Sequence, residues 1–259
     1  MRGIIRDLIL NVAGPFTNPS KGVHILNGHY INKTVRDTDF EQFDRLLSKL
    51  SKTFIFLRFE EACELIIAGE IPDKPCLSFS FDDGFSECYT TIVPVLEKYN
   101  TNACFFINPA VIEKDDAYRL SFIRHQLRND FDKRFMSWDQ IREIHQSGQA
   151  IGNHTLNHKA LLDMPYHEAF EEVKNGKVEL ETRLNFECKY FAFPFGTPDF
   201  FDKTGLKAAC DNHEFVFTSS YEYQHYFFKN NPAVLSRRHF EGSWPVAHLN
   251  YFLSKSRNL

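Results

Sequence analysis

The sequence lacks the signals that mark membrane proteins and nucleic-acid-binding proteins. No apolar run approaches the ~20 residues that a membrane-spanning helix needs. The short apolar stretch near the N-terminus is interrupted by Arg6, Asp7 and Asn11, so it does not read as a secretory signal. The 34 acidic and 30 basic residues give a net charge of −4, which offers no broad attraction to phosphate backbones or anionic lipids. We therefore expect no nucleic-acid partner and no membrane span.

Closely spaced cysteine pairs are also missing. The 6 cysteines are scattered, and none forms the CxxC spacing of zinc fingers or thioredoxin-type sites. Without an export signal, we expect free buried thiols and a cytoplasmic protein.

Phenylalanine is the residue in excess. The 259-residue chain contains 27 Phe but only 2 Trp and 3 Met. So much apolar aromatic surface can build a large core and excludes intrinsic disorder. Since no repeat, low-complexity tract or linker divides the chain, we predict a single domain over residues 1–259.

Strand and helix patterns alternate along the chain. Apolar or alternating segments predict strands within the first 16 residues and at 76–81, 103–107, 150–152, 190–195 and 215–218. Helical spacing of apolar residues predicts helices within 37–54 and at 59–68, 90–99, 138–146, 166–184, 200–210 and 245–253. This alternation is typical of an α/β fold with parallel strands, in which polar residues at strand ends carry the chemistry.

Two adjacent carboxylates, Asp82 and Asp83, follow the predicted strand at 76–81 and precede Gly84. Like charges so close raise each other's pKa unless a cation holds them. The pair is therefore a candidate metal or acid–base site. A polar turn is the alternative, because Asp-Gly is a common turn pair.

Two histidines, His154 and His158, follow the short predicted strand at 150–152. Imidazoles four residues apart can converge on a metal ion, and a carboxylate would complete a three-ligand site open to water. Asn153 and Thr155 are candidates to orient the two rings. The alternative is a pair of surface histidines on a loop.

Taken together, SFDDGF and NHTLNH resemble the motifs of the polysaccharide deacetylase (NodB-homology) family, carbohydrate esterase family 4. The resemblance extends over roughly residues 24–253 and is strongest over 76–196. It implies a distorted (β/α) barrel with about seven strands. It also implies Asp82 as the general base and a divalent metal ion, most often zinc, held by Asp83, His154 and His158.

The third family motif departs from the pattern. FAFPFG has Ala192 where the family has an arginine that pairs with the base. Arg237 or Arg238 is a candidate to replace that arginine in space, and Arg237 is also a candidate substrate contact. Phe193, Pro194 and Phe195 are predicted to contact substrate, the two phenylalanines as walls of an apolar slot for a small acyl group.

The family's last two motifs have no clear match, so the general acid is open. His239, in LSRRH, is the first candidate, although its spacing from Leu235 differs from the family's Leu-x-His. His29 is a second candidate for the pocket, because related deacetylases have a histidine near the end of an N-terminal strand.

These residues predict a metal-dependent hydrolase that removes an acetyl or formyl group from the nitrogen of an amino sugar or sugar precursor during glycan or surface-polysaccharide biosynthesis. In the predicted cytoplasmic location, the substrate would be a nucleotide-linked or lipid-linked sugar. Two alternatives stay open: an amidohydrolase acting on a linear or cyclic non-sugar amide, and a degenerate barrel that binds glycan without hydrolysing it.

Overall fold

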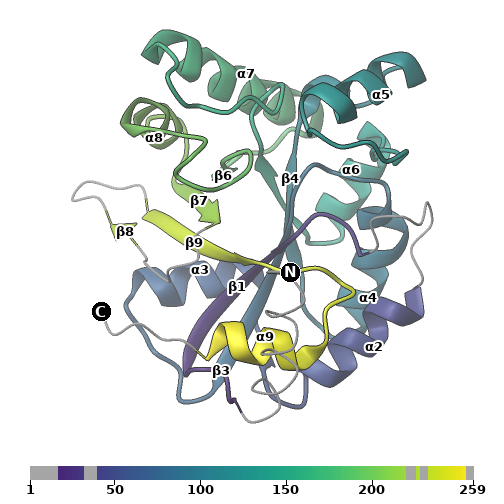
Figure 1. Ribbon diagram of the computed structural model, residues 1–259, viewed down its shortest axis with the longest axis vertical. Coiled ribbons are helices and arrows are strands. Elements are labelled where there is room, and N and C mark those ends of the chain that lie inside the picture. Colours follow the sequence, from purple (N-terminus) through teal and green to yellow (C-terminus); the bar gives the residue numbers. More distant parts are fainter. Residues whose placement is uncertain (1–16, 32–39, 220–225, 228–232, 255–259) are drawn as a thin grey trace, which may run out of the picture.

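The computed structural model describes residues 17–31, 40–219, 226–227 and 233–254. Within this part of the chain, seven parallel strands form a closed barrel (Figure 1). Their order is β1 (Gly22–Gly28), β3 (Pro75–Phe81), β4 (Ala103–Ile107), β5 (Ala150–Asn153), β6 (Tyr190–Ala192), β7 (Phe215–Ser219) and β9 (Ala233–His239). Parallel pairing of β9 with β1 closes the ring. The expected (β/α) barrel is confirmed.

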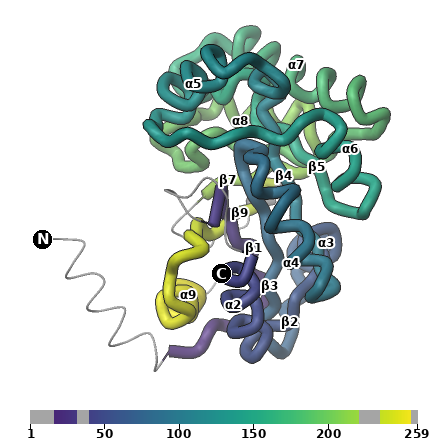
Figure 2. The backbone as a smooth tube through the Cα atoms, turned by 90° about the vertical axis from the view of Figure 1, so that its right-hand side faces the viewer, coloured from purple at the N-terminus to yellow at the C-terminus, as the bar shows by residue number. Residues whose placement is uncertain are grey.

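Two short strands extend the sheet, and helices surround it. β2 (Ile55–Phe56) pairs with β3, and β8 (Tyr226–Phe227) runs antiparallel to β9. The α-helices are α2 (Phe40–Leu50), α3 (Phe59–Ile67), α4 (Val93–Lys98), α5 (Asp116–His125), α6 (Trp138–Gln146), α7 (Tyr166–Leu184), α8 (Lys203–Cys210) and α9 (Val246–Leu253). A π-helical turn, η2 (Cys88–Ile92), leads into α4, and a 3-10 turn, η3 (Pro109–Val111), follows β4. Figure 2 shows α5 to α8 at one end of the long axis and α2, α3 and α9 towards the other.

Local sequence signals explain where several elements begin and end. Ser137 and Gln140 form a capping box at the start of α6. Asp202 accepts hydrogen bonds from the first turn of α8, so this helix starts at Lys203 rather than at residue 200. The strand predicted over 190–195 ends at Ala192, because Phe195 and Gly196 adopt positive φ angles of 62° and 69° and turn the chain. The strand predicted within residues 1–16 lies outside the described residues.

The barrel interior is filled by a compact apolar cluster. All seven barrel strands contribute to it, and α3 adds Phe59, Ala62, Cys63 and Ile66. Phe59 packs edge-on against Phe106 and lies 5.3 Å from the ring of Phe217, measured between centroids. The α3 helix thus closes the amino-terminal end of the barrel and leaves the carboxyl end for polar residues.

Candidate metal centre and active-site cavity

The candidate site lies at the carboxyl ends of the barrel strands. Asp82 and Asp83 directly follow β3, His154 follows β5, and Arg237 lies near the end of β9. All four side chains are buried. Parallel strands bring their carboxyl ends to one rim of the barrel, which is why motifs 70 positions apart meet.

Asp83, His154 and His158 converge on one point. Their ligand atoms all lie within 4.8 Å of one another. Asp83 Oδ1 is 3.7 Å from His154 Nε2 and 3.4 Å from His158 Nε2. These three residues are the metal ligands implied by the sequence motifs, and the fold assembles them from two separate loops.

Backbone carbonyls fix both imidazole rings. His154 Nδ1 is 2.8 Å from the carbonyl oxygen of Ala192, and His158 Nδ1 is 3.1 Å from that of Gln126. Each Nδ1 therefore carries the proton, which leaves both Nε2 atoms unprotonated and directed at Asp83. Ala192, which replaces the family arginine, thus contributes through its backbone.

Asn153 and Thr155 do not orient the rings, contrary to our expectation. The Asn153 side-chain amide donates to the carbonyl of Val173 in α7, at 2.8 Å. The hydroxyl of Thr155 is buried without a hydrogen-bond partner among the described residues. Asn108 supports the loop instead, because its amide donates to the carbonyls of both His154 and Thr155.

The three residues fit a divalent cation. Asp83 Oδ1 and His154 Nε2 are buried and lack a hydrogen-bond partner in the described structure. Burial and the adjacent charge of Asp82 raise the pKa of Asp83 well above its usual value. Burial lowers the pKa values of His154 and His158, so both rings stay neutral. A cation would offset both the repulsion and the missing hydrogen bonds, and two imidazoles with one carboxylate form a donor set typical of zinc.

The loops around this site contain residues in the left-handed region of backbone conformation, with positive φ angles. Four non-glycine residues in them have positive φ: Asp83 (71°), Thr155 (63°), His158 (55°) and Phe195 (62°). Such conformations each cost on the order of 1–3 kcal/mol and cluster at functional sites. Here they place two of the three ligands.

Arg237 holds Asp82 through two hydrogen bonds. Its terminal nitrogens lie 2.7 Å from Asp82 Oδ1 and 3.0 Å from Oδ2. Its guanidinium rests 4.8 Å from the ring centroid of Phe106 in the barrel interior. Burial alone would raise the pKa of Asp82, but the charge and hydrogen bonds of Arg237 hold it well below its ordinary value. Of the two arginines proposed from sequence, Arg237 is therefore the one that pairs with Asp82.

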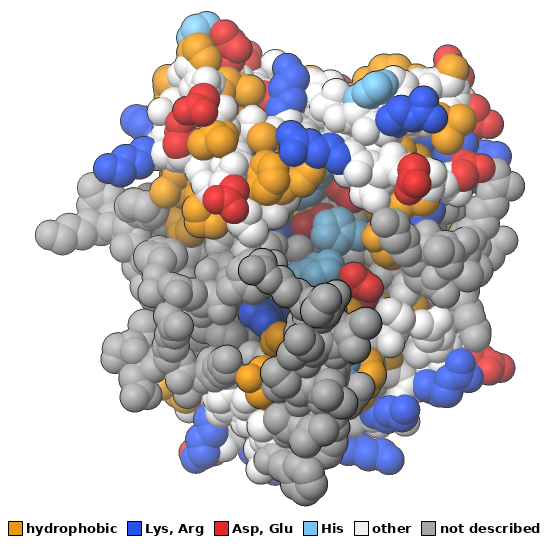
Figure 3. Space-filling model, viewed as in Figure 1, with side chains coloured by type: hydrophobic (Ala, Val, Ile, Leu, Met, Phe, Trp, Pro, Cys, Tyr) orange, Lys and Arg blue, Asp and Glu red, His pale blue; other side chains and the backbone are white. Residues whose placement is uncertain are grey.

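A cavity of about 400 Å³ opens beside Asp82. His29, His239 and Phe195 line it, as the sequence analysis had placed them near the substrate. The other lining residues are Asn27, Thr197, Ser219, Arg238, Glu241, Trp244 and Phe252. Figure 3 shows this hollow near the middle of the face, with histidine and acidic side chains inside and basic and hydrophobic side chains on its upper rim.

Phe193 and Pro194 do not belong to this cavity. Phe193 is fully buried in the outer apolar layer, where its ring stacks on Phe201 at 4.0 Å between centroids. Alternation explains the correction for Phe193, because Ala192 faces the barrel interior and its neighbours Phe191 and Phe193 face outwards. Only Phe195 turns inward, and its ring packs edge-on against His158, with 4.8 Å between centroids. Arg237 lies against Asp82 and is not a lining residue.

Several residues of the site carried no recognisable sequence signal. Gln126 contacts His158 through its backbone carbonyl, and the Asn108 side chain binds backbone carbonyls of the His154 loop. Many other sequences could provide these contacts. Trp244 and Phe252 line the cavity from the region of α9, which has no counterpart among the motifs. The rarity of tryptophan, with 2 in the chain, was the one hint for Trp244.

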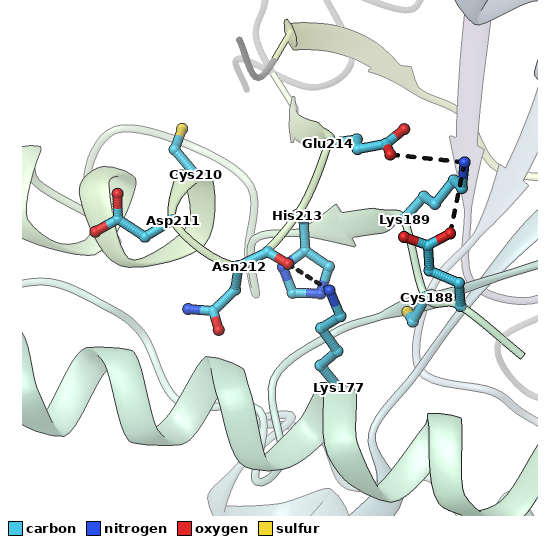
Figure 4. A pocket seen from close by; sticks show the side chains of 9 residues that line it. Lys177, Cys188, Lys189, Cys210, Asp211, Asn212, His213 and Glu214 are labelled. Atoms are coloured by element: carbon cyan, nitrogen blue, oxygen red, sulfur yellow. Dashed lines mark hydrogen bonds and ion pairs between the residues drawn. The ribbon is translucent and has the colours of Figure 1, made fainter. Parts of the chain in front are cut away.

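A second cavity, of about 260 Å³, lies at the amino-terminal ends of β6 and β7, away from this site. Figure 4 shows the two lysines of this cavity with their partners. Lys177 donates to the carbonyl of Asn212 at 2.7 Å, and Lys189 lies 3.7 Å from Glu187 and 3.6 Å from Glu214.

Among the described helices, none is long and apolar enough to cross a membrane.

Comparisons with known proteins identify the family and the fold. A curated relative, "Putative polysaccharide deacetylase YxkH" of Bacillus subtilis (strain 168), is 25% identical over 150 residues, which cover 58% of this chain and 46% of the relative. This chain thus matches less than half the length of that protein.

Two solved structures share the fold over nearly the whole chain. The Streptococcus pyogenes deacetylase PplD in complex with acetate has a TM-score of 0.68 at 21% identity, covering 91% of this chain and 99% of its own. IcaB from Ammonifex degensii has a TM-score of 0.70 at 20% identity, covering 92% and 99%. The polysaccharide deacetylase family profile matches residues 69–212, more than half of the sequence and the part that carries Asp82, Asp83, His154 and His158. The chain belongs to the polysaccharide deacetylase family.

Proposed function

We propose that this protein is a metal-dependent hydrolase that removes a small N-acyl group from an amino sugar. The observation that carries the proposal is the buried Asp83–His154–His158 cluster beside Asp82, which Arg237 holds at the edge of the cavity. Burying these unpaired polar groups in strained loops destabilises the fold, and a barrel that only binds glycan would gain nothing from them. Zinc is the cation we propose, because of the two imidazoles.

Asp82 is the proposed general base. A divalent cation bound at the cluster would polarise the acyl carbonyl and lower the pKa of an attacking water. Asp82 stays ionised because of Arg237, so it can accept the proton of that water. The two hydrogen bonds from Arg237 fix the carboxylate, and Asp82 Oδ2 lies 3.9 Å from His154 Nε2, next to the cluster.

His239 is the proposed proton donor to the departing amine. It lines the cavity, and its side chain is partly open to solvent, with Nε2 3.9 Å from a carboxylate oxygen of Glu241. His29 is nearer to Asp82, but burial lowers its pKa to about 4, so it is neutral at pH 7. A nearby cation would lower that pKa further.

The cavity fits one sugar ring with a small acyl group. Its aromatic lining residues can pack against the apolar faces of a ring, and its polar residues can meet hydroxyls. The acetate in the related PplD structure supports acetyl as the acyl group, with formyl as the smaller alternative. A nucleotide-linked or lipid-linked sugar in the cytoplasm remains our proposal for the substrate. It is supported by six cysteines that are all free, as expected in a reducing compartment.

The proposal is tested with purified protein loaded with Zn²⁺ or Co²⁺. Free, nucleotide-linked and lipid-linked N-acetyl and N-formyl sugars are supplied, together with linear and cyclic non-sugar amides, and released acid is measured. We expect release from at least one acylated sugar and none in Asp82→Asn. Release only from non-sugar amides, or none from fully metallated protein, contradicts the proposal.

The proton donor is tested by changing the leaving group. His239→Gln should lose about 10²- to 10⁴-fold in turnover of an amide. The loss should be far smaller for an activated acetyl ester, whose leaving group needs no proton. If His29→Gln shows this dependence and His239→Gln does not, the assignment is reversed.

A further inference from the structure

Asn27 offers an unused hydrogen-bond acceptor on the cavity. Its side chain is 2% exposed and lines the same cavity as Asp82 and His29. Its amide nitrogen donates to Ser219 Oγ at 3.1 Å, whereas its Oδ1 has no partner. Among the buried side-chain atoms that lack a partner in the described structure, Asn27 Oδ1 alone belongs to a residue lining this cavity.

The surroundings hold this amide in place. The Asn27 backbone pairs in register with Ser80 of β3 and His239 of β9, and its carbonyl accepts from Phe240 N at 2.9 Å. Asn27 is thus fixed where β1 joins β3 and β9. Its side chain has little freedom to find another partner.

Its partner Ser219 is also fixed. Ser219 N donates to the carbonyl of Gly196 at 2.6 Å, and a Cβ on Gly196 would lie 2.5 Å from Ser219 Oγ. This close packing, which requires glycine, presents the hydroxyl to Asn27. Asn27 Nδ2 donates to this hydroxyl, and Oδ1 is the end of the amide without a partner.

A buried carbonyl without a partner destabilises the free protein, so most such atoms in native structures are paired. The other unpaired buried atoms next to Asp82 are Asp83 Oδ1 and His154 Nε2, which belong to the candidate metal cluster, and Nε of Arg237, a donor on the guanidinium that holds Asp82. Asn27 Oδ1 lies outside that cluster and needs a donor rather than a cation.

We propose that Asn27 Oδ1 accepts a hydrogen bond from the substrate and is a specificity-determining residue. The donor is the N–H of the acylamino group or a hydroxyl of the same sugar. The inference rests on the proposed deacylation. A site with a buried polar group discriminates strongly against a ligand that leaves the group unpaired, whereas an apolar slot discriminates weakly.

The first experiment uses the unaltered protein and changes the substrate. Starting from the best N-acylated sugar, one analogue replaces N–H by an ester oxygen, and others replace each hydroxyl in turn by hydrogen or O-methyl. We expect one analogue to lose about 30-fold or more in kcat/KM. Loss with the ester identifies N–H as the donor, and loss with a deoxy or O-methyl analogue identifies that hydroxyl.

The second experiment repeats the series in Asn27→Ala. The sensitive analogue should now match the parent substrate within about 3-fold, because the protein no longer has an acceptor to leave unpaired. Comparing ratios within each protein removes the intrinsic reactivity difference between esters and amides. Ser219→Ala, which frees the amide to rotate, should lose part of the selectivity. Thr197→Val, a change at another lining residue with no unpaired buried atom, should keep the ratio.

Metal content and Tm separate recognition from folding. Asn27→Ala should keep its metal and a Tm no lower than that of the unaltered protein, since it removes an unpaired buried oxygen. The inference is overturned if, for every analogue, the ratio of its kcat/KM to that of the parent substrate is the same within about 3-fold in Asn27→Ala and in the unaltered protein. If no sugar is deacylated, the proposed function fails. The inference is then tested by dissociation constants of the same analogues, measured by calorimetry on zinc-loaded protein, and their ratios are compared between the unaltered protein and Asn27→Ala.

Discussion

The two ends of the barrel differ in whether their charged and polar side chains have hydrogen-bond or ion-pair partners. At the amino-terminal end, the lysines of the second cavity have partners, and Asn102 joins β4 to Glu60 of α3 and to the carbonyl of Gly148, although Nδ1 of His213 is buried there without a partner among the described residues. At the carboxyl end, Asp83 and His154 are buried with ligand atoms unpaired, in loops with positive φ.

This difference separates what stabilises the barrel from what its chemistry requires. Paired polar groups and the apolar residues of α3 that pack into the barrel stabilise the amino-terminal end. The carboxyl end keeps unpaired groups that destabilise the protein until a cation or a substrate reaches them. Substitutions at the two ends should therefore have different consequences.

The largest effect should come from removing a metal ligand. Asp83→Ala and His154→Ala should each abolish bound metal and turnover, because two remaining ligands hold zinc poorly. The matched control is His213→Gln at the opposite end, which changes another buried histidine. It should lose stability yet keep its zinc. Metal analysis after dialysis checks both, and full metal content in the ligand variants would falsify the assignment.

The Asp82–Arg237 pair should show strong coupling. Asp82→Asn should keep the metal and lose about 10²- to 10⁴-fold in turnover. Arg237→Gln leaves a buried carboxylate unpaired, so the free energy of unfolding should fall by about 3–5 kcal/mol. The double variant should regain part of that stability, although not activity. Denaturant titrations of all four proteins measure the coupling, and additive losses would show that the pair is not a unit.

The buried histidines should make the metal-free protein sensitive to acid. Burial lowers the pKa to about 4 in His29 and to about 3 in His213. Both take up protons below about pH 6.5 in the unfolded chain but stay neutral in the folded one. The free energy of unfolding should therefore be unaffected by them above about pH 6.5 and fall between about pH 6.5 and 4, by up to about 1.4 kcal/mol per pH unit for each group. Urea titrations across this range test it, and His29→Gln should flatten the dependence.

The smallest effect should come from the exposed charges at the amino-terminal end. Lys189 is 43% exposed and its ion pairs are longer than 3.5 Å. Lys189→Gln should change the free energy of unfolding by less than about 0.5 kcal/mol, because water screens such pairs. Turnover should be unchanged. A large loss of activity would mean that the two ends are coupled through the barrel.

Much of the fold was predictable because its signals are local. The strand at Ala103–Ile107 and the helix at Tyr166–Leu184 were predicted to the residue, and the capping residue Ser137 was identified for α6. The metal cluster was predictable because short motifs carry all three ligands. β9 and α5 were not predicted from the sequence, and the other errors came from contacts that depend on the folded chain.

Side-chain direction is the clearest example. Phe193 and Phe195 look equivalent in sequence, yet the positive φ of Phe195 and the alternation of β6 send one into the cavity and the other into the outer layer. Arg237 could be named only as one of two candidates, because its pairing with Asp82 depends on how the barrel closes. Asn27 gave no signal, because an unpaired oxygen is visible only in three dimensions.

Closure of the barrel by the last strand has a consequence for synthesis. Arg237 reaches Asp82 across 155 positions, whereas the metal ligands are complete once residue 158 has been made. The 79 residues between His158 and Arg237 (237 − 158) take roughly 4–16 s to translate at ~5–20 residues per second. During that interval a nascent chain has Asp83, His154 and His158 but not the arginine that holds Asp82. The carbonyl of Ala192, which holds the His154 ring, is made in the same interval, so the arrangement of both Asp82 and His154 depends on chain that is synthesised after the candidate ligands.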